Sequence, residues 1–586
     1  MKKQHDFVYD VRDIMTMKDI VDGSAQEYAD NTAFLWHTKE GIAEKTFSEV
    51  YNDIKALSAY FNSLGLENKK IGIIAKNSYR WALTYLTVTA GVGVVVPFDR
   101  EIKEEELKYL ASDSEIAAIA YSDDCAAKCE ALPENIIRLP MSSYDEFTER
   151  GNALRTLDDR SYEEHEIDPN ALGILIYTSG TTGAAKGVML SQYNICSDIM
   201  HVTRRVRIYE TDRVLSVLPL HHTYACMADF LSIFYAGASI AYNDSLRYLQ
   251  SDFKDFSPTV LVAVPVVLEK LRNKILKNYE KIFMGNTVLG LQRTFAKMFA
   301  SNNDKRARKI FSAVSSAFGG RLRAVLCGAA SLAPEVFEDY MRFGITVYVG
   351  YGLTETAPVC IMHNDFYQCA DDIGYPITGV KVKLIDENSE GVGELAVKGS
   401  NVMIGYYKNP EETARVMLDG YFLTGDLAKK NPNGSYSIVG RRKSMIVTSN
   451  GKKIFPEEIE YYLSESKLVS ECLVFGEEKD EKIVVAASVY PNYEEVNEVL
   501  AEKGITPESE NYDEEVRKLI LNIVKGVNAK LPAFKSVHSL KIRKKDFVKT
   551  TTRKVKRYLK ENLSEEEETS EETIIQKRSE NEYAKQ

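Results

Sequence analysis

A stretch rich in glycine and hydroxyl side chains, with one lysine near its end, carries the clearest chemistry in this sequence. It reads Tyr177-Thr-Ser-Gly-Thr-Thr-Gly-Ala-Ala-Lys-Gly-Val188 and follows an apolar run, 172–176, that predicts a buried strand. Glycine lets the backbone approach a ligand, hydroxyl and N–H groups can donate to phosphate oxygens, and Lys186 adds a positive charge. The pattern predicts a loop that holds nucleotide phosphates. It is not a Walker motif, because Lys186 is followed by glycine rather than by serine or threonine.

Four later motifs carry further groups that could take part in a reaction of a bound nucleotide. Val349-Gly-Tyr-Gly-Leu-Thr-Glu-Thr356 places a hydroxyl and a carboxylate beside a glycine turn, as a magnesium–phosphate site requires. Gly420-Tyr-Phe-Leu-Thr-Gly-Asp426 ends in an acid that could accept hydrogen bonds from ribose hydroxyls. Gly440-Arg-Arg-Lys-Ser-Met-Ile446 contains three adjacent cations, and Lys549-Thr-Thr-Thr-Arg-Lys-Val-Lys-Arg557 offers a lysine near the C-terminus.

Each motif also has a simpler explanation. The first could be a surface loop whose composition is rich in glycine, serine and threonine without any ligand. Glu355 and Asp426 could cap a helix and a turn, and Lys443 and Lys554 could be solvated surface charges. These alternatives stay open for each motif taken singly.

The segments around these motifs predict the elements that must position them. Short apolar runs predict buried strands at 71–75, 92–97, 172–176, 213–218, 259–264 and 322–326, with helices at 47–64 and 104–111. Such alternation predicts parallel sheets covered by helices. Residues 374–439 change to short strands with Gly and Asn-Gly turns, which predicts a small all-β unit. A last mixed segment, about 443–560, carries strands at 472–475 and 482–489.

Bulk composition sets limits on the class of protein. A chain of 586 residues is long enough for several domain-sized units, and 44% hydrophobic with 27% charged residues is typical of a globular protein. The net charge of −11 argues against a general nucleic-acid binder. Eight cysteines show no metal-like pairing and predict reduced thiols of a cytosolic protein. No secretory signal or membrane span is predicted, so we expect a cytoplasmic protein that is either soluble or peripheral to the cytoplasmic face of the membrane.

The motifs, taken in order, resemble those of the acyl-adenylate-forming superfamily, which includes acyl-CoA synthetases, luciferases and the adenylation domains of peptide synthetases. The resemblance covers 177–557 and, more weakly, reaches back to about residue 30. It implies an α/β large domain, 1–441, of two helix-covered, mostly parallel sheets with a small β-barrel unit at 374–440. It also implies a smaller, mobile α+β C-terminal domain at 442–560. We expect the acidic, polar tail at 561–586 to be disordered.

The resemblance also assigns roles by position. It implies ATP and Mg²⁺ as cofactors and coenzyme A as co-substrate, with Glu355 as the metal ligand and Lys554 as the lysine that stabilises the adenylation transition state. Lys443 matches the hinge of the small domain, and Gly451 would border the tunnel for the pantetheine arm. The ATP-binding set would be Thr178, Ser179, Gly180, Thr181, Thr182, Gly183, Lys186, Gly328, Ala329, Ala330, Tyr351, Gly352, Thr354, Asp426 and Arg441.

The sequence departs from the family pattern at several positions. Proline is usual where Ala185, Ala330 and Val548 stand, and aspartate where Ser444 stands. We expect the missing prolines to cost loop rigidity rather than chemistry. Arg553 in place of a glycine is the more serious change, because it alters backbone freedom beside Lys554. Since each essential polar residue is present, we expect activity.

Two segments bear on the acyl substrate. Leu218-Pro-Leu-His-His-Thr-Tyr224 resembles the family's lining of the acyl carboxylate site, which makes His222 and Thr223 candidate substrate-binding residues; a hydrogen-bonded core histidine is the alternative. The long segment 272–320 resembles that of long-chain fatty-acyl-CoA synthetases. It holds ten Lys or Arg against two acids, with Leu291, Phe295, Met298 and Phe299 on one helical face. Such a helix could lie on an anionic membrane surface or pack on its own domain, and we favour the second.

The sequence therefore predicts an ATP-dependent ligase that activates a fatty acid, most simply a long-chain one, through acyl-AMP to acyl-CoA. Its partners would be the fatty acid, ATP and CoA, without nucleic acid. A ligase that loads an acyl-carrier protein is the nearest alternative, because both acceptors present the same thiol arm. A non-catalytic acyl- or nucleotide-binding scaffold is the alternative from another class.

Overall fold

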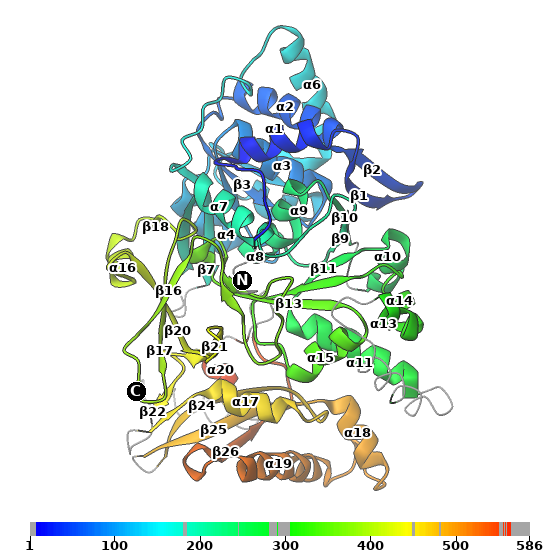
Figure 1. Ribbon diagram of the computed structural model, residues 1–586, viewed down its shortest axis with the longest axis vertical. Coiled ribbons are helices and arrows are strands. Elements are labelled where there is room, and N and C mark those ends of the chain that lie inside the picture. The colour runs from blue at the N-terminus through cyan, green and yellow to red at the C-terminus, as the bar shows by residue number, and fades with distance from the viewer. Residues whose placement is uncertain are drawn as a thin grey trace, which may run out of the picture. The chain divides into compact units, whose positions relative to one another are not determined.

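The computed structural model describes residues 8–179, 185–243, 245, 247–280, 290, 305–447, 452–479, 482–549, 555, 557 and 559–563. These residues fall into two compact units. The first comprises the described residues up to 424 together with 428–438, and the second comprises 425–427 and the described residues from 439 onward. Each unit is described by itself below (Figure 1).

A seven-stranded sheet and a nine-stranded sheet dominate the first unit. The first has the order β18-β8-β7-β4-β3-β5-β6 and the second β15-β14-β13-β12-β11-β9-β10-β1-β2. In the first sheet the neighbouring strands β7, β4, β3, β5 and β6 are parallel, and in the second the neighbouring strands β13, β12, β11, β9, β10 and β1 are parallel. The outer strands β8, β18, β14, β15 and β2 pair antiparallel with their neighbours. The predicted helix-covered, mostly parallel sheets are confirmed.

The strands of these two sheets have the following bounds: β1 Thr32–Thr38, β2 Gly41–Thr46, β3 Lys70–Ile74, β4 Val94–Pro97, β5 Ala118–Tyr121, β6 Ile137–Pro140, β7 Leu172–Ser179, β8 Ala185–Ser191, β9 Arg213–Ser216, β10 Ser239–Tyr242, β11 Val260–Ala263, β12 Ala324–Cys327, β13 Thr346–Gly352, β14 Val359–Met362, β15 Tyr375–Pro376 and β18 Gly405–Tyr406. The helices of this unit are α1 Met17–Glu27, α2 Phe47–Ser63, α3 Tyr79–Gly91, α4 Glu104–Ser114, α5 Ala126–Glu130, α6 Tyr144–Thr156, α7 Gln192–Thr203, α8 Thr223–Ala225, α9 Ser232–Tyr235, α10 Leu249–Phe256, α11 Pro265–Glu280, α13 Lys305–Ile310, α14 Ser312–Ala317, α15 Pro334–Arg342 and α16 Pro410–Arg415.

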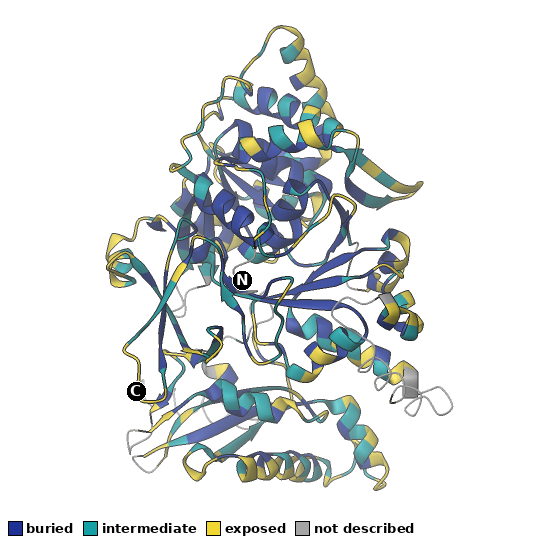
Figure 2. Cartoon of the chain, viewed as in Figure 1, coloured by how far each residue is buried: buried dark blue, intermediate teal, exposed yellow. Residues whose placement is uncertain are grey.

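The core of the first unit forms because these strands are apolar on both faces and the helices between them are amphipathic or fully buried. One cluster of buried side chains joins both sheets and includes Phe34 of β1, Ile73 of β3, Ile174 of β7 and Phe230. Figure 2 shows the strands buried and the outer helix faces exposed. Burial on both faces is the expected consequence of parallel sheets covered by helices.

The segment predicted to be a small β unit contains most of a five-stranded sheet. The strands are β16 Lys381–Ile385, β17 Val392–Lys398, β19 Met417–Leu418, β20 Tyr421–Lys430 and β21 Tyr436–Arg441, in the order β16-β17-β20-β19 with β21 on β20. Two short strands of the same segment pair elsewhere: β15 joins the nine-stranded sheet, and β18 joins the seven-stranded sheet. The predicted β unit is therefore tied to both large sheets through its own backbone.

The second unit is the predicted mixed α and β segment. It holds a three-stranded sheet, β24-β25-β26, and a two-stranded sheet, β22-β23. Its elements are β22 Ile446–Val447, β23 Lys453–Ile454, α17 Pro456–Ser464, β24 Val469–Lys479, β25 Lys482–Pro491, α18 Tyr493–Ala501, α19 Tyr512–Lys530, β26 Val537–Ile542 and α20 Lys560–Leu563. Buried residues of α17 and α19, such as Ile459 and Ile520, share one core with Val485 of β25.

The predicted start of the disordered tail at residue 561 is wrong. Glu561 to Leu563 belong to α20, and the side chain of Asn562 is fully buried. Its amide accepts from the Val548 N–H at 2.9 Å and donates to the Val548 carbonyl at 2.9 Å. The backbone N–H and carbonyl of Val548 are thereby hydrogen-bonded, and these bonds hold α20 against the rest of the second unit. Residues 564–586 of the predicted tail lie outside the described residues.

The cysteine prediction is consistent with the structure: all eight are free thiols, and six of them are buried. Within the described part of the chain, no helix has both the length and the apolar content needed to cross a bilayer. Of the long basic segment 272–320, residues 281–289 and 291–304 lie outside the described residues, including all four apolar residues of the predicted helical face.

Candidate active site

The β7–β8 hairpin carries the first phosphate-binding candidates. Thr178 of β7 stands opposite Lys186 of β8 in the antiparallel register, and its hydroxyl points to the Lys186 carbonyl at 3.5 Å. A capping box of Ser191 and Asn194 then begins α7 directly after β8, which fixes the end of the hairpin. The side chain of Ser179 and the loop residues Gly180, Thr181, Thr182 and Gly183 lie outside the described residues.

The ammonium of Lys186 is held by two side chains that the sequence motifs did not include. It forms an ion pair with the Glu412 carboxylate, and both side chains are mostly buried, with 18% and 15% exposed. It also lies 5.1 Å from the centre of the Tyr406 ring, in a cation–π position. Arg415 pairs with the same Glu412 carboxylate at 2.7 Å. The lysine is thus already oriented by an acid that phosphate oxygens could replace.

Glu355 lies beside this group. The Tyr406 hydroxyl donates to Glu355 Oε1 at 2.8 Å, and the Glu355 carbonyl accepts from the Met403 N–H at 2.9 Å. Burial raises the pKa of Tyr406, and the neighbouring Glu355 carboxylate raises it further, so the phenol stays a donor at neutral pH. One aromatic side chain therefore links the carboxylate of Glu355 with the ammonium of Lys186.

The backbone explains why these residues meet. β18 pairs antiparallel with β8, with Tyr406 opposite Val188, and the Tyr407 N–H donates to the Gly187 carbonyl at 2.7 Å. This pairing brings residues 403–412 to the hairpin that carries Lys186. The sequence signal available for Glu412 was Asn409-Pro-Glu-Glu412, a helix start in which Asn409 caps α16 through the Glu412 N–H. That signal predicts a helix, but it does not place the helix at Lys186.

Glycine is required where the strand reaches the Thr354–Thr356 turn. A Cβ at Gly352 would lie 1.6 Å from the Pro358 carbonyl oxygen, so no larger residue fits without separating β13 from β14. Tyr351 precedes it in the same strand, opposite Ile361 of β14. Thr354 and Glu355 follow in a short 3₁₀ turn. Close packing of these two strands therefore sets the position of the turn that presents the hydroxyl and carboxylate.

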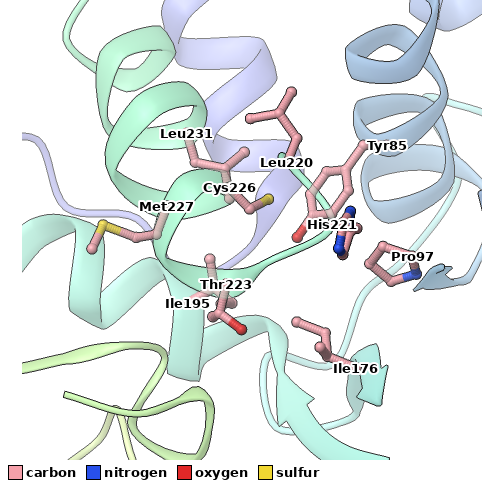
Figure 3. Close-up of a pocket in the computed structure, with 10 residues that line it drawn as sticks. All are labelled: Tyr85, Pro97, Ile176, Ile195, Leu220, His221, Thr223, Cys226, Met227 and Leu231. Atoms are coloured by element: carbon pink, nitrogen blue, oxygen red, sulfur yellow. The ribbon is translucent and has the colours of Figure 1, made fainter. Parts of the chain in front are cut away.

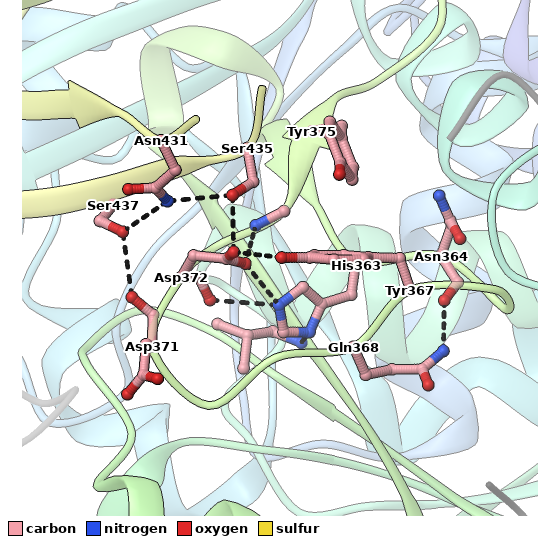
Figure 4. A network of polar contacts seen from close by, with 12 residues as sticks. His363, Asn364, Tyr367, Gln368, Asp371, Asp372, Tyr375, Asn431, Ser435 and Ser437 are labelled. Carbon is pink, nitrogen blue, oxygen red and sulfur yellow. Dashed lines mark hydrogen bonds and ion pairs between the residues drawn. The ribbon is translucent and has the colours of Figure 1, made fainter. Parts of the chain in front are cut away.

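A buried polar network supports the same strand (Figure 4). The Val349 N–H donates to Nδ1 of the fully buried His363 at 3.0 Å, so the other ring nitrogen carries the proton and faces the Asp372 carbonyl at 3.1 Å. The Asp372 carboxylate accepts hydrogen bonds from Tyr367 and Ser435. Burial would raise the pKa of Asp372, but hydrogen bonds from His363, Ser435 and Tyr367 outweigh it and leave the pKa lowered. The network ties β13, β14 and the β20–β21 hairpin together.

The end of β12 supplies the predicted nucleotide- and acyl-lining residues. Gly328, Ala329 and Ala330 follow the strand directly, and Ala329 has a positive φ of 70°, which marks a sharp turn there. A Cβ at Gly328 would lie 2.8 Å from Cζ of Tyr224. The aromatic ring therefore packs against the bare backbone at the carboxyl end of β12, which is the edge where ligands bind in open α/β sheets.

A narrow apolar pocket lies at the ends of β4 and β7 (Figure 3). The predicted acyl segment 218–224 contributes Leu220, His221 and Thr223 to its lining, and His222 is not among the lining residues. Burial lowers the pKa of His221 to about 4, so this imidazole is neutral at pH 7. The two histidine rings lie 4.1 Å apart. The pocket is lined by Tyr85, Pro97, Ile176, Ile195, Leu220, His221, Thr223, Cys226, Met227 and Leu231.

The remaining predicted site residues belong to the second unit. Asp426 is 3% exposed, and its carboxylate pairs with Arg441 Nε at 2.9 Å. The Arg442 N–H donates to the Gly425 carbonyl at 2.9 Å, so a backbone hydrogen bond also holds residues 441–442 beside residues 425–426. Lys443 is exposed. Gly451 and Lys554 lie outside the described residues.

Together, the first unit offers a lysine and a hydroxyl on the β7–β8 hairpin and a hydroxyl and a carboxylate on the Thr354–Thr356 turn, which suits a magnesium–triphosphate group. No cluster of three or more His, Cys, Asp or Glu side chains that could hold a metal occurs in the described part of the chain. Magnesium in nucleotide sites needs only one or two protein carboxylates, because phosphates and waters complete its shell. Glu355 fits that requirement.

Comparison with known proteins agrees with this arrangement. Residues 21–407 match the AMP-binding enzyme family, and residues 443–586 match the AMP-binding enzyme C-terminal domain. The long-chain-fatty-acid–CoA ligase 3 of Saccharomyces cerevisiae is 30% identical over 480 residues, which cover 72% of this chain and 68% of the yeast protein. The chloroplastic long-chain-fatty-acid–[acyl-carrier-protein] ligase AEE15 of Arabidopsis thaliana is 28% identical, covering 82% of this chain and 77% of the plant protein.

Among solved structures, the o-succinylbenzoate CoA synthetase of Bacillus subtilis with its acyl-adenylate has a similar fold. The TM-score is 0.72 at 18% identity, over 94% of this chain and 99% of the bacterial one. Another structure of that enzyme contains ATP and a magnesium ion. The family match covers more than half of the chain, and the predicted resemblance is confirmed. This chain belongs to the AMP-binding enzyme family, the adenylate-forming ligases.

Proposed function

We propose that this chain is an ATP-dependent acyl-CoA synthetase that activates a long-chain fatty acid. In the first step the fatty carboxylate attacks the α-phosphate of ATP, giving acyl-AMP and pyrophosphate. In the second step the CoA thiol attacks the acyl carbonyl, giving acyl-CoA and AMP. No protein nucleophile is needed in either step, because the fatty carboxylate and the CoA thiol attack directly; pyrophosphate leaves in the first step and AMP in the second.

The observation that carries the proposal is the convergence of Lys186, Glu355 and Tyr406 in the first unit. Attack of a carboxylate on a triphosphate gathers negative charge, and catalysis requires positive charge held in place before the reaction. Lys186 supplies a fixed cation, and Glu355 supplies one carboxylate oriented by the Tyr406 hydroxyl. Magnesium bound there would neutralise charge on the leaving pyrophosphate. The hydroxyl groups of Thr178 and Thr354 would donate hydrogen bonds to the phosphate oxygens.

In the second unit we propose that Asp426 and Arg441 bind the ribose hydroxyls. Their ion pair orients the carboxylate, and carboxylate oxygens accept hydrogen bonds of the kind that ribose hydroxyls donate. Lys443 would act as the hinge, Gly451 would border the pantetheine tunnel, and Lys554 would stabilise the adenylation transition state. By sequence the large domain would span 1–441 and the mobile domain 442–560, whereas the compact units of the structure group 425–427 and 439–441 with the second. Motion between the domains would separate the two half-reactions.

The choice of a long-chain fatty acid is supported by the yeast relative, which is named for that substrate class. Apolar side chains gather around the neutral His221 in the predicted acyl segment, which is the kind of environment that an acyl chain requires. The plant relative is named for transfer to acyl-carrier protein, so carrier protein is the second candidate acceptor. A cytoplasmic location stays a prediction.

Release of AMP tests the proposal directly. Purified protein with ATP and magnesium would be supplied with fatty acids of graded length, with CoA, with carrier protein, or with neither. We expect AMP release that depends on a long acyl chain and on one thiol acceptor. Absence of both AMP formation and pyrophosphate–ATP exchange with every acid would instead indicate a non-catalytic scaffold.

The two half-reactions can be separated with Lys554→Ala. We expect this variant to lose adenylation while still converting supplied acyl-AMP to thioester. Lys549→Ala is a matched control, because the Lys549 ammonium is paired with Glu471 and Asp546 at 2.6 and 2.9 Å and is structural in this unit. Equal loss of both half-reactions in Lys554→Ala, or loss of adenylation in the control, would refute this division of roles.

A further inference from the structure

Three buried polar side chains in the first unit lack the partners that burial requires. Tyr224, Asp229 and Tyr242 each bury their polar oxygens from solvent, and Asp229 as a whole is 0% exposed. Neither carboxylate oxygen of Asp229 and neither phenol oxygen has a hydrogen-bonding partner within the described residues. Since nearly all buried polar groups in folded proteins are paired, four such atoms in one place call for an explanation.

The three side chains form one cluster. The Asp229 carboxylate contributes to the raised pKa of both Tyr224 and Tyr242, after the larger effect of burial. The Ser216 hydroxyl lies near enough to favour ionisation of Asp229, but outside hydrogen-bonding geometry. Burial dominates and holds the pKa of Asp229 well above its usual range. A carboxyl offers acceptor oxygens and, when protonated, one donor as well, and each phenol offers one donor and one acceptor.

The cluster lies near two segments that are predicted to line the substrate site. Cys226, which lines the pocket of Figure 3, lies close enough to Tyr242 to contribute to its raised pKa. Tyr224 packs against Gly328 at the end of β12. Ser216 and Tyr242 are the last residues of β9 and β10, so the cluster lies at the carboxyl edge of the nine-stranded sheet. That edge is where ligands bind in folds of this kind.

A second buried acid in the same unit shows what a structural role looks like. Asp198 is also 0% exposed, and burial likewise raises its pKa well above the usual range. Its carboxylate, however, accepts from the Val359 N–H at 3.2 Å and from the Asn401 amide at 3.4 Å. The acid that supports the fold is hydrogen-bonded by the protein, whereas none of the described residues hydrogen-bonds to Asp229. The missing partner of Asp229 is therefore expected to come from a bound molecule.

We propose that Asp229, Tyr224 and Tyr242 recognise a hydroxyl group on the acyl chain, so that the preferred substrate is a hydroxylated fatty acid. This inference rests on the proposed function. A hydroxyl can donate to the carboxyl and accept from a phenol, and it adds no charge to a site that excludes water. A site built to hydrogen-bond a substrate hydroxyl discriminates strongly against the analogue that lacks it, because its own polar groups are then left unpaired.

The test compares hexadecanoic acid with a series of monohydroxyhexadecanoic acids in which the hydroxyl is moved along the chain. For the full-length protein with ATP, magnesium and CoA, we expect kcat/KM for AMP release to peak at one position. The best hydroxy acid should exceed hexadecanoic acid by about tenfold or more. Calorimetric binding of the same acids without ATP should show the same preference.

Variants then assign the preference to the cluster. Asp229→Leu should lower kcat/KM for the best hydroxy acid more than for hexadecanoic acid, so that the ratio of the two falls towards one, and Tyr242→Phe should lower this ratio less. Asp198→Asn is the matched control and should leave the ratio unchanged. A flat positional profile in the unaltered protein overturns the inference, and so does equal loss with both acids in a folded Asp229→Asn variant. Those results would leave the proposed function standing, whereas no AMP from any fatty acid would remove the proposed function itself.

Discussion

Replacing Tyr406 by phenylalanine isolates one hydrogen bond at the proposed magnesium ligand. The hydroxyl donates to Glu355 Oε1 at 2.8 Å, and the Tyr406 ring is only 6% exposed. Phenylalanine keeps the ring, so the cation–π contact with Lys186 at 5.1 Å is retained. What is lost is the group that fixes the direction of one Glu355 oxygen. We expect magnesium to bind less well while the protein stays folded.

The size of the effect follows from the geometry. A hydrogen bond to a charged acceptor contributes roughly 1.5–3 kcal/mol. A factor of ten corresponds to about 1.4 kcal/mol, so the apparent magnesium affinity should fall roughly ten- to hundredfold. Loss of an outer partner of a metal ligand in other proteins has a cost of the same order, about 10–100-fold.

The assay measures initial rates of fatty-acid-dependent pyrophosphate–ATP exchange over a magnesium titration at fixed ATP. Tyr407→Phe is the matched control, because it removes a neighbouring hydroxyl that bonds to Lys70 at 2.6 Å and Glu115 at 2.8 Å instead. The control should titrate like the unaltered protein. A double-mutant cycle with Glu355→Gln should show that the two changes are not additive.

An unchanged magnesium titration for Tyr406→Phe would refute this reasoning. It would mean either that Glu355 does not hold the metal or that its orientation does not depend on Tyr406. Full additivity with Glu355→Gln would point to the same conclusion. A lower rate with an unchanged magnesium requirement would place the role of Tyr406 in catalysis or stability instead.

Two further predictions concern the strand that presents Glu355. Gly352→Ala should lower the free energy of unfolding by about 1–3 kcal/mol in a denaturant titration, because its Cβ would overlap the Pro358 carbonyl oxygen; Gly350→Ala, whose nearest neighbour lies at 3.9 Å, should have little effect. The pKa of Asp372 in the folded protein lies below its value of about 3.9 in the unfolded chain. The ionised carboxylate therefore stabilises the fold above about pH 3.9, and this contribution is lost as the pH falls through the folded-state pKa. Asp372→Asn should therefore be less stable at pH 7 and show a smaller loss of stability on acidification below about pH 4, measured by denaturant midpoints; an unchanged pH profile would contradict the role of this carboxylate.

The fold was largely predictable because hydrophobic period and breaker residues are local signals. The run 71–75 became β3 at Lys70–Ile74, and the helix expected at 47–64 became α2 at Phe47–Ser63, begun by the capping box of Thr46 and Glu49. The start of the tail was misjudged for a physical reason. Composition reports the average polarity of a segment, whereas Asn562 is retained by two hydrogen bonds to one distant residue, Val548.

The sequence by itself determined which residues could do chemistry, because glycine turns, hydroxyls, a lysine and a carboxylate at short spacing are readable without a fold. It could not determine what surrounds them. Glu412 and Tyr406 reach Lys186 only because β18 pairs with β8, and Asp229 is buried without a hydrogen-bonding partner among the described residues only because of how the chain packs around it. Contacts between segments far apart in the chain depend on strand pairing and packing. Only the tertiary structure decides which of these contacts form.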